Sequence, residues 1–340
     1  MSFRITVLMG GTSSERDVSL ASGIRVAEAL RSRGHEIRAV DPARGEISLE
    51  EQRALAGGVV VQTAPPSQDA LRRMAREALP RMAGTLPRSG ETDVVFLGLH
   101  GGTGEDGTIQ AMLDLTGVPY TGSGHLASAL AMDKDLSKQL FRQAGVTTAD
   151  WLMAPVTAEE VGTKLGFPVI VKPSKQGSTV GLSIVRNPGE LQAAIEEAAH
   201  FDDEVMVEAF IAGRELTVGI LGGDALPVGE IIPKHEIYDY ECKYTPGMAD
   251  ERFPAELTSA EAARIQQEAR AAFKALKLGG YARIDFRMSE NGRFYCLEAN
   301  TLPGMTQTSL IPQAAAAAGI SFPELCERIV RLAMTRGGNV

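Results

Sequence analysis

Cysteine and long apolar runs are scarce in this sequence, and both absences limit what the protein can be. The 340 residues contain three cysteines, an odd number without a CxxC pair, which argues against a disulfide scaffold and a zinc site. The apolar runs are short and interrupted, so no transmembrane helix is expected. Residues 1–10 lack the apolar core and cleavage site of a signal peptide and predict a strand instead. We therefore expect a cytoplasmic protein without a membrane partner.

Familiar nucleotide-binding motifs are also missing. The chain has no GK[ST] of a Walker A loop and no HRD or DFG of a protein kinase. Gly10 and Gly11 follow a predicted strand and precede a predicted helix, and Asp41 ends the next strand. This arrangement is similar to a dinucleotide-binding unit, but the glycine spacing is not GxGxxG. A Rossmann-type site is left as an alternative.

The composition is that of a globular protein of two or three domains. Hydrophobic residues make up 44% of the chain, which excludes general disorder. The net charge of −9, from 34 basic and 43 acidic residues, argues against a nucleic-acid partner. An anionic small ligand is not excluded, because it needs only local positive charge.

Strand and helix patterns alternate from the start of the chain, which predicts an α/β fold with a mostly parallel sheet. A helix that ends before Gly34 separates the first two strands, and Ser14-x-x-Asp17 fits a capping box at its start. The strands of this part are predicted at residues 4–9, 36–40 and 93–97.

The rest of the chain predicts two α+β units. The turn Glu290-Asn291-Gly292 indicates a hairpin of residues 281–288 and 293–298. The expected domains are residues 1–124, 125–212 and 213–340, the last with an irregular segment, 233–254. The other predicted elements are strands at 167–172, 182–185, 204–208, 215–221 and 228–232 and helices at 125–144, 158–165, 190–199 and 259–277.

The segment 46–90 is less regular. Residues 59–61 could form a strand, and the apolar spacing of residues 68–79 predicts an amphipathic helix. Its other face carries Arg72, Arg73 and Arg76, which we interpret as a solvated basic face rather than a binding patch.

A loop rich in glycine and hydroxyl groups follows Lys172 at the end of a predicted strand. Residues 173–181 read PSKQGSTVG, and such a loop offers backbone N–H groups to phosphate oxygens while the lysine adds a positive charge. A mobile hairpin with a surface lysine explains the same residues. The sequence pattern alone leaves both interpretations open.

The predicted hairpin carries charges that an apolar hairpin would not bury without a purpose. Arg283 and Asp285 are two residues apart and share one face of their strand, so Asp285 can converge with Glu298 and Asn300. Three oxygen ligands without His or Cys suit Mg²⁺. A cross-strand charge pair with a capping Asn is the alternative, and the cost of burying charge favours the metal.

Two further loops could serve a ligand site. The glycine-rich residues 100–107 begin with His100 and follow a predicted parallel strand, at the end where such sheets bind ligands; a flexible loop is the alternative. Residues 238–244 are aromatic and charged, and they could form a lid that excludes water or a plain surface loop.

Together these motifs resemble the D-alanine–D-alanine ligase family of the ATP-grasp superfamily, in the family's order and over nearly the whole chain. The resemblance implies an ATP-grasp fold, in which an N-terminal parallel-sheet domain precedes two α+β domains that sandwich ATP. The matching runs are GGTSSERDVSL at 10–20, HGGTGEDG at 100–107, PYTGSG at 119–124, MDK at 132–134, residues 171–181, residues 238–244, Arg283-Ile284-Asp285 and LEANTLPGMT at 297–306.

The resemblance also implies an ATP site. Asp285, Glu298 and Asn300 would bind magnesium or manganese, in two ions. The ATP contacts would come from Glu208, Ala209, Phe210 and Ile211 at the adenine, Glu215 at the ribose, and Lys134, Lys172, Ser178 and Lys243 at the phosphates.

A D-alanine site is implied beside it. Glu15 would bind the amino group of the first D-alanine, with His100 next to it. A hydrogen-bonded triad of Glu15, Ser178 and Tyr244 would close the lid. Catalysis would use Arg283 and the N–H of Gly304 to stabilise the oxyanion, and the second carboxylate would be received by Ser309 and Leu310.

The activity that this resemblance implies is ATP-dependent joining of two D-alanines through a D-alanyl phosphate, for peptidoglycan synthesis, by a homodimer. D-lactate or D-serine as acceptor and a ligase for other amino acids are alternatives within the fold. A non-catalytic ATP-binding regulator is the alternative from a different class. The complete set of Asp285, Glu298 and Asn300 argues against it, because a regulator could lose its metal ligands.

Overall fold

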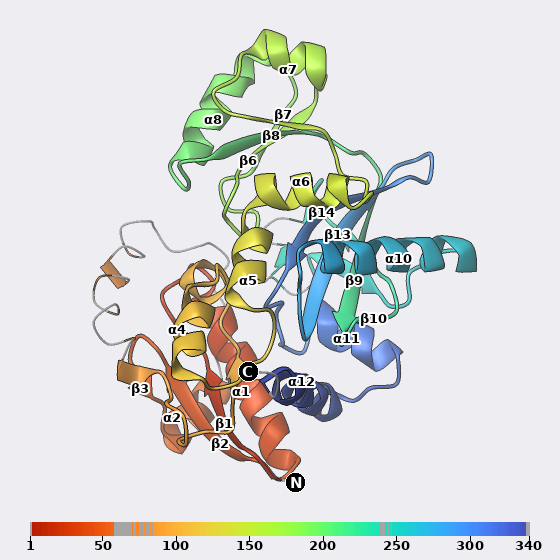
Figure 1. The fold of residues 1–340 in the computed structure, drawn as a ribbon. Helices are drawn as coiled ribbons and strands as arrows, with labels where there is room; N and C mark the ends of the chain where they lie inside the picture. Colours follow the sequence, from red (N-terminus) through yellow and green to blue (C-terminus); the bar gives the residue numbers. More distant parts are fainter. Residues whose placement is uncertain are drawn as a thin grey trace.

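Three β-sheets, each with its own helices, organise the computed structural model of the chain (Figure 1). The structure describes residues 2–57, 70, 73–74, 76, 78, 82, 84–238, 242–243, 245 and 247–337. The predicted strand 59–61 and Tyr244 lie outside these residues. Within them, no helix is long and apolar enough to cross a membrane.

The first sheet confirms the predicted parallel arrangement. Its strand order is β3-β2-β1-β4, and β1 runs parallel to both β2 and β4. The elements are β1 Arg4–Leu8, α1 Arg16–Ser32, β2 Glu36–Asp41, β3 Gly45–Glu46, α2 Leu49–Ala56, β4 Val94–Leu97, the 3₁₀ turn Gly102–Gly104 and α4 Thr108–Thr116. Strands β1 and β4 therefore end at the same edge, where residues 10–17 and 98–107 meet.

The second sheet lies at the top of Figure 1 and is fully antiparallel, in the order β5-β8-β6-β7. Helices α7 and α8 cover it, and the predicted glycine-rich loop connects β6 to β7. Its elements are β5 Trp151–Met153, α7 Ala158–Lys164, β6 Val169–Pro173, β7 Ser183–Val185, the 3₁₀ turn Pro188–Glu190, α8 Leu191–Ala199 and β8 Val205–Ala209.

The third sheet has the order β12-β11-β9-β13-β14, with β10 paired to β9. Its apolar face packs on α5, α6 and α10. The elements are α5 His125–Met132, α6 Lys134–Gln143, β9 Arg214–Leu221, β10 Asp224–Ala225, β11 Gly229–Pro233, β12 Ala249–Arg252, α10 Ser259–Ala275, β13 Tyr281–Met288, β14 Phe294–Asn300, α11 Leu310–Ala317 and α12 Phe322–Gly337.

Three local predictions are wrong. The single helix 125–144 is two helices, because Asp133 leaves the helical conformation and its side chain caps α6 by accepting from Leu136 N. The capping box at Ser14 is absent, since the N-cap of α1 is Glu15, whose carboxylate instead accepts from Ser178. The irregular segment 233–254 contains a strand, β12, which pairs with β11.

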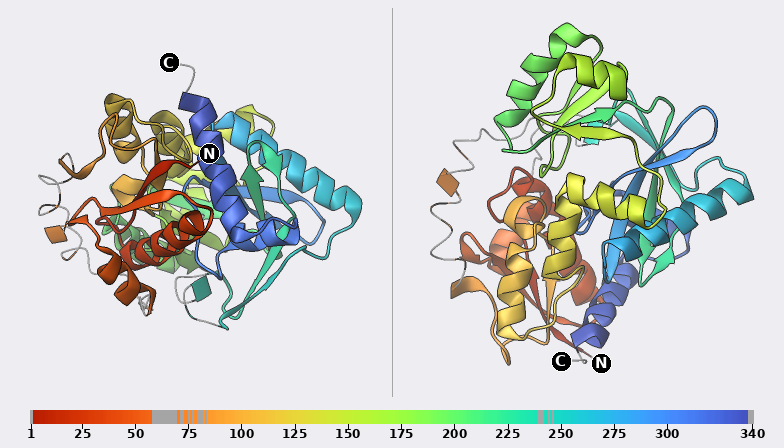
Figure 2. Two further views of the ribbon diagram at one scale, coloured as in Figure 1. Left: turned by 90° about the horizontal axis from the view of Figure 1, so that it is seen from below. Right: turned by 45° about the horizontal axis from the view of Figure 1, so that its top comes forward.

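The last helix, α12, returns to the first sheet. Leu325, Ile329 and Val330 are fully buried in the same apolar cluster as β1 and α1, and Arg25 of α1 stacks over Phe322 at 4.0 Å. Figure 2 shows α12 in dark blue beside α1. The two ends of the chain therefore share one core.

Truncating Ile329 should test this shared core. Ile329→Ala removes a fully buried side chain and should lower the free energy of unfolding by about 2–5 kcal/mol. Urea denaturation measures the change. Leu115→Ala is the control, because Leu115 on α4 is 90% exposed and its loss should cost less than about 0.5 kcal/mol. An Ile329→Ala protein as stable as the control would contradict the shared core.

Candidate functional site

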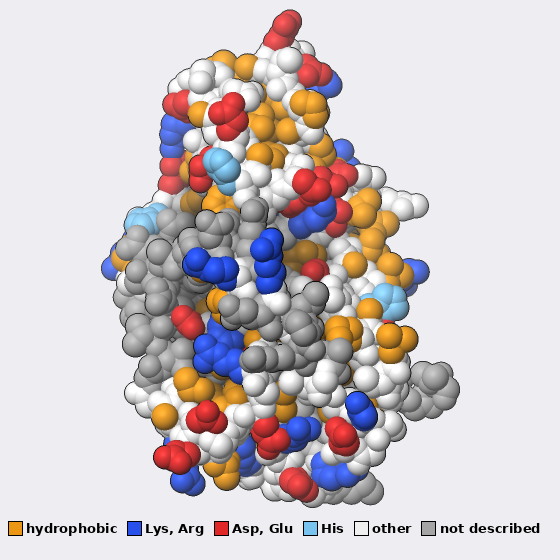
Figure 3. All heavy atoms as spheres, turned by 90° about the vertical axis from the view of Figure 1, so that its left-hand side faces the viewer, with side chains coloured by type: hydrophobic (Ala, Val, Ile, Leu, Met, Phe, Trp, Pro, Cys, Tyr) orange, Lys and Arg blue, Asp and Glu red, His pale blue; other side chains and the backbone are white. Residues whose placement is uncertain are grey.

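Two adjoining pockets lie where the three sheets meet. The first is enclosed by β6, β8, β9, β13 and β14, and the second lies between the first sheet and residues 300–310. Figure 3 shows Lys and Arg side chains on the middle of one face of the molecule and others along its lower part. Both pockets are lined by Gly177, Ser178, Tyr238, Lys243, Arg283 and Leu310.

Successive side chains along β9 and β13 point alternately into the core and into the first pocket. Ile284 and Phe286 are fully buried in the apolar cluster, whereas Arg283, Asp285 and Arg287 line the first pocket. This arrangement confirms that Arg283 and Asp285 share one face of their strand.

A β-bulge continues the polar face onto β14. Asp285 pairs with Glu298, but the next residue, Phe286, pairs with Cys296, so Leu297 is left over. Phe294 and Cys296 point into the core, and strict alternation from them would bury Glu298 and Asn300 there as well. The bulge shifts the alternation by one residue and turns both toward the pockets.

The structure brings Asp285, Glu298 and Asn300 together. Asn300 Nδ2 donates to Asp285 Oδ2 at 2.9 Å, and Thr217 Oγ1 donates to Asp285 Oδ1 at 2.8 Å. Arg283 donates from Nε to both Asp285 oxygens, at 2.9 and 3.2 Å, and from Nη2 to Oδ2 at 2.8 Å. Two carboxylates and an amide oxygen are ligands that suit Mg²⁺. In the described part of the chain, however, no cluster of three His, Cys, Asp or Glu residues has metal-binding geometry.

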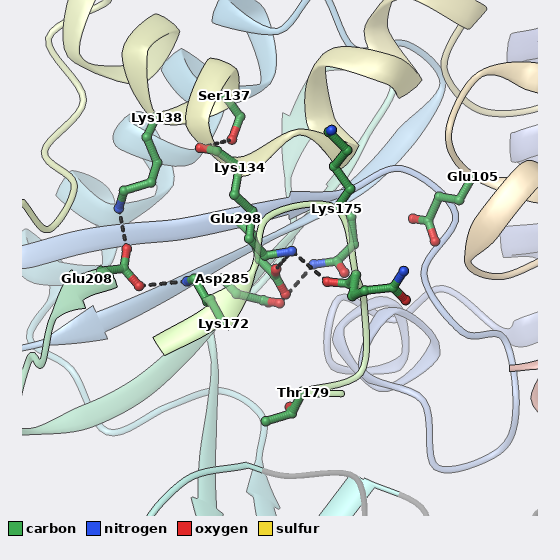
Figure 4. Close-up of polar contacts among 12 residues, drawn as sticks. Glu105, Lys134, Ser137, Lys138, Lys172, Lys175, Thr179, Glu208, Asp285 and Glu298 are labelled. Carbon is green, nitrogen blue, oxygen red and sulfur yellow. Dashed lines mark hydrogen bonds and ion pairs between the residues drawn. The ribbon is translucent and has the colours of Figure 1, made fainter. Parts of the chain in front are cut away.

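Lysines neutralise the carboxylates of the first pocket (Figure 4). Lys134 Nζ lies 3.3 Å from Glu298 Oε2 and donates to the Gln176 carbonyl at 2.7 Å. Burial alone would raise the pKa of Glu298, but Lys134, Lys243 and Lys172 hold it at about 2. Glu298 is therefore ionised at neutral pH, as a metal ligand has to be.

One part of the first pocket is lined by apolar side chains and by two charged ones. Arg287 Nη1 lies 3.3 Å from Glu215 Oε2, and Arg287 Nε donates to the Ile211 carbonyl at 3.1 Å. Burial raises the pKa of Glu215, against the effect of Arg287. Ala209 ends β8, and Phe210 and Ile211 follow it along the same wall, so the residues expected around an adenine do lie together.

The glycine-rich loop after β6 joins the two pockets. Ser178 and Thr179 have φ of 51° and 62°, a conformation that turns successive N–H groups toward one side. Ser178 Oγ donates to Glu15 Oε1 at 2.5 Å, and Thr179 Oγ1 donates to the Tyr238 carbonyl at 3.0 Å. Lys243 Nζ lies 5.5 Å from the centre of the Tyr238 ring. The loop thus contacts both Glu15 and the described end of the expected lid.

His100 in the second pocket uses both ring nitrogens within the protein. Its Nδ1 bonds the Leu302 carbonyl at 2.8 Å, so Nδ1 carries the proton, and its Nε2 accepts from Ser22 Oγ at 2.9 Å. Ser22 Oγ in turn accepts from Met305 N at 3.1 Å. Burial lowers the pKa of His100, which favours this neutral form. The chain of bonds holds residues 302–305 from both ends.

Glu105 holds the same segment from the other side. Its Oε1 accepts from the N–H groups of Thr301 and Leu302, both at 3.0 Å, and its Oε2 accepts from Gly101 N at 3.2 Å. Burial and the charge of Glu15 raise the pKa of Glu105 to about 7. Gly101 has a φ of 62°, which favours glycine, and a Cβ there would also displace Glu15 Oε2, 2.6 Å away.

Gly304 and the start of α11 complete the second pocket. Ser309 is the N-cap of α11, and its Oγ accepts from Thr306 N at 2.9 Å. Ser309 and Leu310 line the pocket beside Gly304, so the first N–H groups of α11 face it with the positive end of the helix dipole. This end suits a carboxylate.

Comparisons with known proteins agree with this geometry. Family models described as the N-terminus and the C-terminus of D-ala D-ala ligase match residues 4–123 and 134–331. The D-alanine–D-alanine ligase of Syntrophotalea carbinolica is 42% identical over 333 residues, 98% of this chain and 97% of its own. That of Geobacter sulfurreducens is 44% identical over 330 residues, 96% of this chain and 93% of its own.

This chain belongs to the D-alanine–D-alanine ligase family. Among solved structures, the Coxiella burnetii ligase has a TM-score of 0.81 at 28% identity, covering 99% of this chain and 95% of its own. The Bacillus anthracis ligase complexed with ATP has a TM-score of 0.76 at 33% identity, covering 99% of both chains. The expected ATP-grasp fold is therefore confirmed.

Four residues that line the pockets or hold the residues lining them were not expected from the sequence. Glu105 lies inside the quoted motif 100–107, where a carboxylate within a glycine-rich run was the signal. Ser22 lies two residues beyond the quoted motif 10–20, and no sequence signal singled it out. Arg287 and Lys138 also escaped attention, although they follow Asp285 by two residues and Lys134 by four, the same-face spacing of a strand and of a helix.

The raised pKa of Glu105 makes stability depend on pH. Between pH 4.5 and about 7 the folded protein keeps a proton that the unfolded chain has released. The free energy of unfolding should therefore fall by roughly 3 kcal/mol over this window and level off above it. Glu105→Gln keeps an acceptor for Thr301 and Leu302 but cannot titrate, so this fall should disappear. Urea denaturation from pH 4.5 to 8 measures it.

Glu196→Gln supplies the control for this measurement, because Glu196 is exposed on α8. It should retain the wild-type pH dependence. The assignment fails if Glu105→Gln and wild type lose stability in parallel over the same window.

Proposed function

We propose that this protein joins two D-alanines to D-alanyl-D-alanine with ATP, through a D-alanyl phosphate, for peptidoglycan precursor synthesis. The observation that carries the proposal is the pair of adjoining pockets, one cationic and one with the start of α11, that share Lys243 and Arg283. Family membership and the ligase complexed with ATP support it.

ATP is assigned to the first pocket. The adenine would lie along Glu208, Ala209, Phe210 and Ile211, with the ribose at Glu215. The phosphates would extend toward Lys134, Lys172 and Lys243 and the N–H groups near Ser178. The support for this direction is that Lys243 lines both pockets and that Lys134 donates to the Gln176 carbonyl, next to Gly177, which also lines both.

The two D-alanines are assigned to the second pocket. Glu15 would take the ammonium group of the first, and the start of α11, with Ser309 and Leu310, would take the carboxylate of the second. His100 would lie beside Glu15 and act by positioning residues 302–305, because its ring nitrogens already bond Leu302 and Ser22. Tyr244, expected to complete a triad with Glu15 and Ser178, keeps this role as a proposal.

Magnesium or manganese, in two ions, is assigned to Asp285, Glu298 and Asn300. When bound, the metal would neutralise charge on the phosphates. Arg283 and Asn300 now occupy both Asp285 oxygens, so one of these hydrogen bonds would have to give way.

In the first step the carboxylate of one D-alanine attacks the γ-phosphate of ATP, and ADP leaves. Two anions must approach each other, and the chain lowers this repulsion with Lys134, Lys172 and Lys243 at the phosphates. Glu15 orients the amino acid so that its carboxylate, rather than its ammonium group, faces the phosphate.

In the second step the amine of the other D-alanine attacks the acyl carbon, and phosphate leaves. A negative charge develops on the acyl oxygen. Arg283 and the Gly304 N–H are proposed to stabilise this charge. Hydrogen bonds of residues 301 and 302 with His100 and Glu105 hold the segment that carries Gly304 in place. A lid from residues 233–254 would exclude water, which hydrolyses acyl phosphates.

The remaining expectations are part of the same proposal. The working units would be residues 1–124, 125–212 and 213–340. Closure of the first pocket around ATP would then move the second sheet toward the third. The protein would act as a homodimer in the cytoplasm, with D-alanine and ATP as partners and without nucleic acid. Light scattering after gel filtration would measure the oligomeric state.

The direct test is ADP formation with D-alanine, L-alanine and D-lactate offered separately, with D-alanine present as donor for the lactate assay. D-alanine alone should support turnover in a manner that requires a divalent ion, and the product should be the dipeptide. A depsipeptide from D-lactate would identify the alternative acceptor, and ATP binding without turnover on any amino acid would indicate a regulator.

Arg283 has a predicted effect on the rate of the second step. Arg283→Ala removes an oxyanion donor worth about 3–4 kcal/mol, so kcat should fall by two orders of magnitude or more, with a smaller change in KM for ATP. Steady-state kinetics measures both values. Arg264→Ala, an exposed arginine on α10, is the matched control and should keep wild-type kinetics. Full turnover by Arg283→Ala would show that another group performs this role.

A further inference from the structure

Lys138 is a buried charge that the mechanism above does not use. It lies on α6, one turn after Lys134, and its side chain is 0% exposed. Its Nζ bonds Glu208 Oε1, donates to Thr148 Oγ1 at 2.5 Å, and lies 5.1 Å from the centre of the Trp151 ring. An isolated ammonium group is too costly to bury at such a site, so Lys138 depends on these partners.

The contacts of Lys138 suit a charged ammonium group. Thr148 Oγ1 gives its own proton to the Cys296 carbonyl at 2.7 Å, so it accepts from Lys138. The Glu208 carboxylate only accepts, and the face of an aromatic ring attracts a cation. Burial lowers the pKa of Lys138, and the charge of Glu208 acts in the opposite direction.

Glu208 is shared between two lysines. Its second oxygen, Oε2, lies 2.6 Å from Nζ of Lys172, and Figure 4 shows the three side chains as one chain of contacts from Lys138 through Glu208 to Lys172. Despite its burial, the two lysines hold the pKa of Glu208 at about 2. Lys138 does not line the pocket, whereas Glu208 and Lys172 do.

From this arrangement we propose that Lys138 is a positioning residue for ATP: it compensates the charge of Glu208 so that Lys172 keeps a net positive charge for the phosphates. The trio carries one net positive charge with Lys138 and none without it. If Lys138 is lost, Glu208 neutralises Lys172 alone. This inference rests on the proposed function, because it assumes that the first pocket binds ATP.

The test uses the ratio of two dissociation constants, that of adenosine divided by that of ATP, measured by titration calorimetry with Mg²⁺ present. The ratio isolates the contribution of the phosphates from that of the adenine pocket. Lys138→Met, which is close in length and uncharged, should lower the ratio about tenfold, which is about 1.4 kcal/mol. Binding of adenosine itself should change far less.

Two further variants separate charge from structure. Glu208→Gln removes the carboxylate charge and should leave the ratio at or above the wild-type value, even if it weakens both ligands at the adenine. The double variant Lys138→Met/Glu208→Gln restores one net positive charge to the trio and should return the ratio to within about twofold of wild type. The double variant replaces the buried Lys138–Glu208 pair by two uncharged side chains and leaves only Lys172 charged, at the pocket wall, so it tests the proposal if Lys138→Met alone does not fold.

Lys164→Met controls for the net charge of the protein, because Lys164 lies exposed on α7, and its ratio should equal that of wild type. An unchanged ratio in Lys138→Met, or a lowered ratio that Glu208→Gln does not restore, would overturn the inference. Failure of the wild-type protein to bind ATP more tightly than adenosine would instead refute the proposed function.

Discussion

Charge compensation in a partly closed cleft is the constraint on which the rest of the structure depends. Among the described residues that line the first pocket, five are cationic and four are carboxylates. Burying so many charges is tolerable only if they are paired. The pairs are Lys134 with Glu298, Lys172 with Glu208, Arg283 with Asp285 and Arg287 with Glu215. Because each of the four carboxylates already has a cation, one positive charge is left over, and it is available to a polyanion.

This surplus charge lies beside the proposed oxyanion site, which has to be rigid, and the first sheet provides the rigidity. His100 and Glu105 come from the loop after β4, and they hold residues 301–305 through backbone groups rather than through side chains. Because these bonds are made to the backbone, they position the segment that carries the Gly304 N–H whatever side chains residues 301–305 have. The return of α12 onto the core of the first sheet ties the same parts of the chain together a second time.

Local patterns were sufficient for much of the fold and the site. Alternation placed Arg283 and Asp285 on one face of β13, and the Asn291-Gly292 turn fixed the hairpin, because both depend on neighbouring residues only. The helix break at Asp133 was missed, since apolar spacing continues across it and the capping hydrogen bond to Leu136 overrides it. The capping box predicted at Ser14 is absent, because the N-cap is Glu15, whose carboxylate accepts from Ser178, a residue distant in sequence.

The sequence by itself determined which chemical groups this protein has and in what order: glycine-rich loops after strands, lysines at strand and helix ends, and two carboxylates with an amide on a hairpin. Only the tertiary structure decided which of them meet. The bulge after Asp285 turns Glu298 and Asn300 out of the core, and Glu208 joins Lys138 to Lys172 from three different elements. These outcomes depend on register and on packing between distant segments, and no local preference of the chain encodes either.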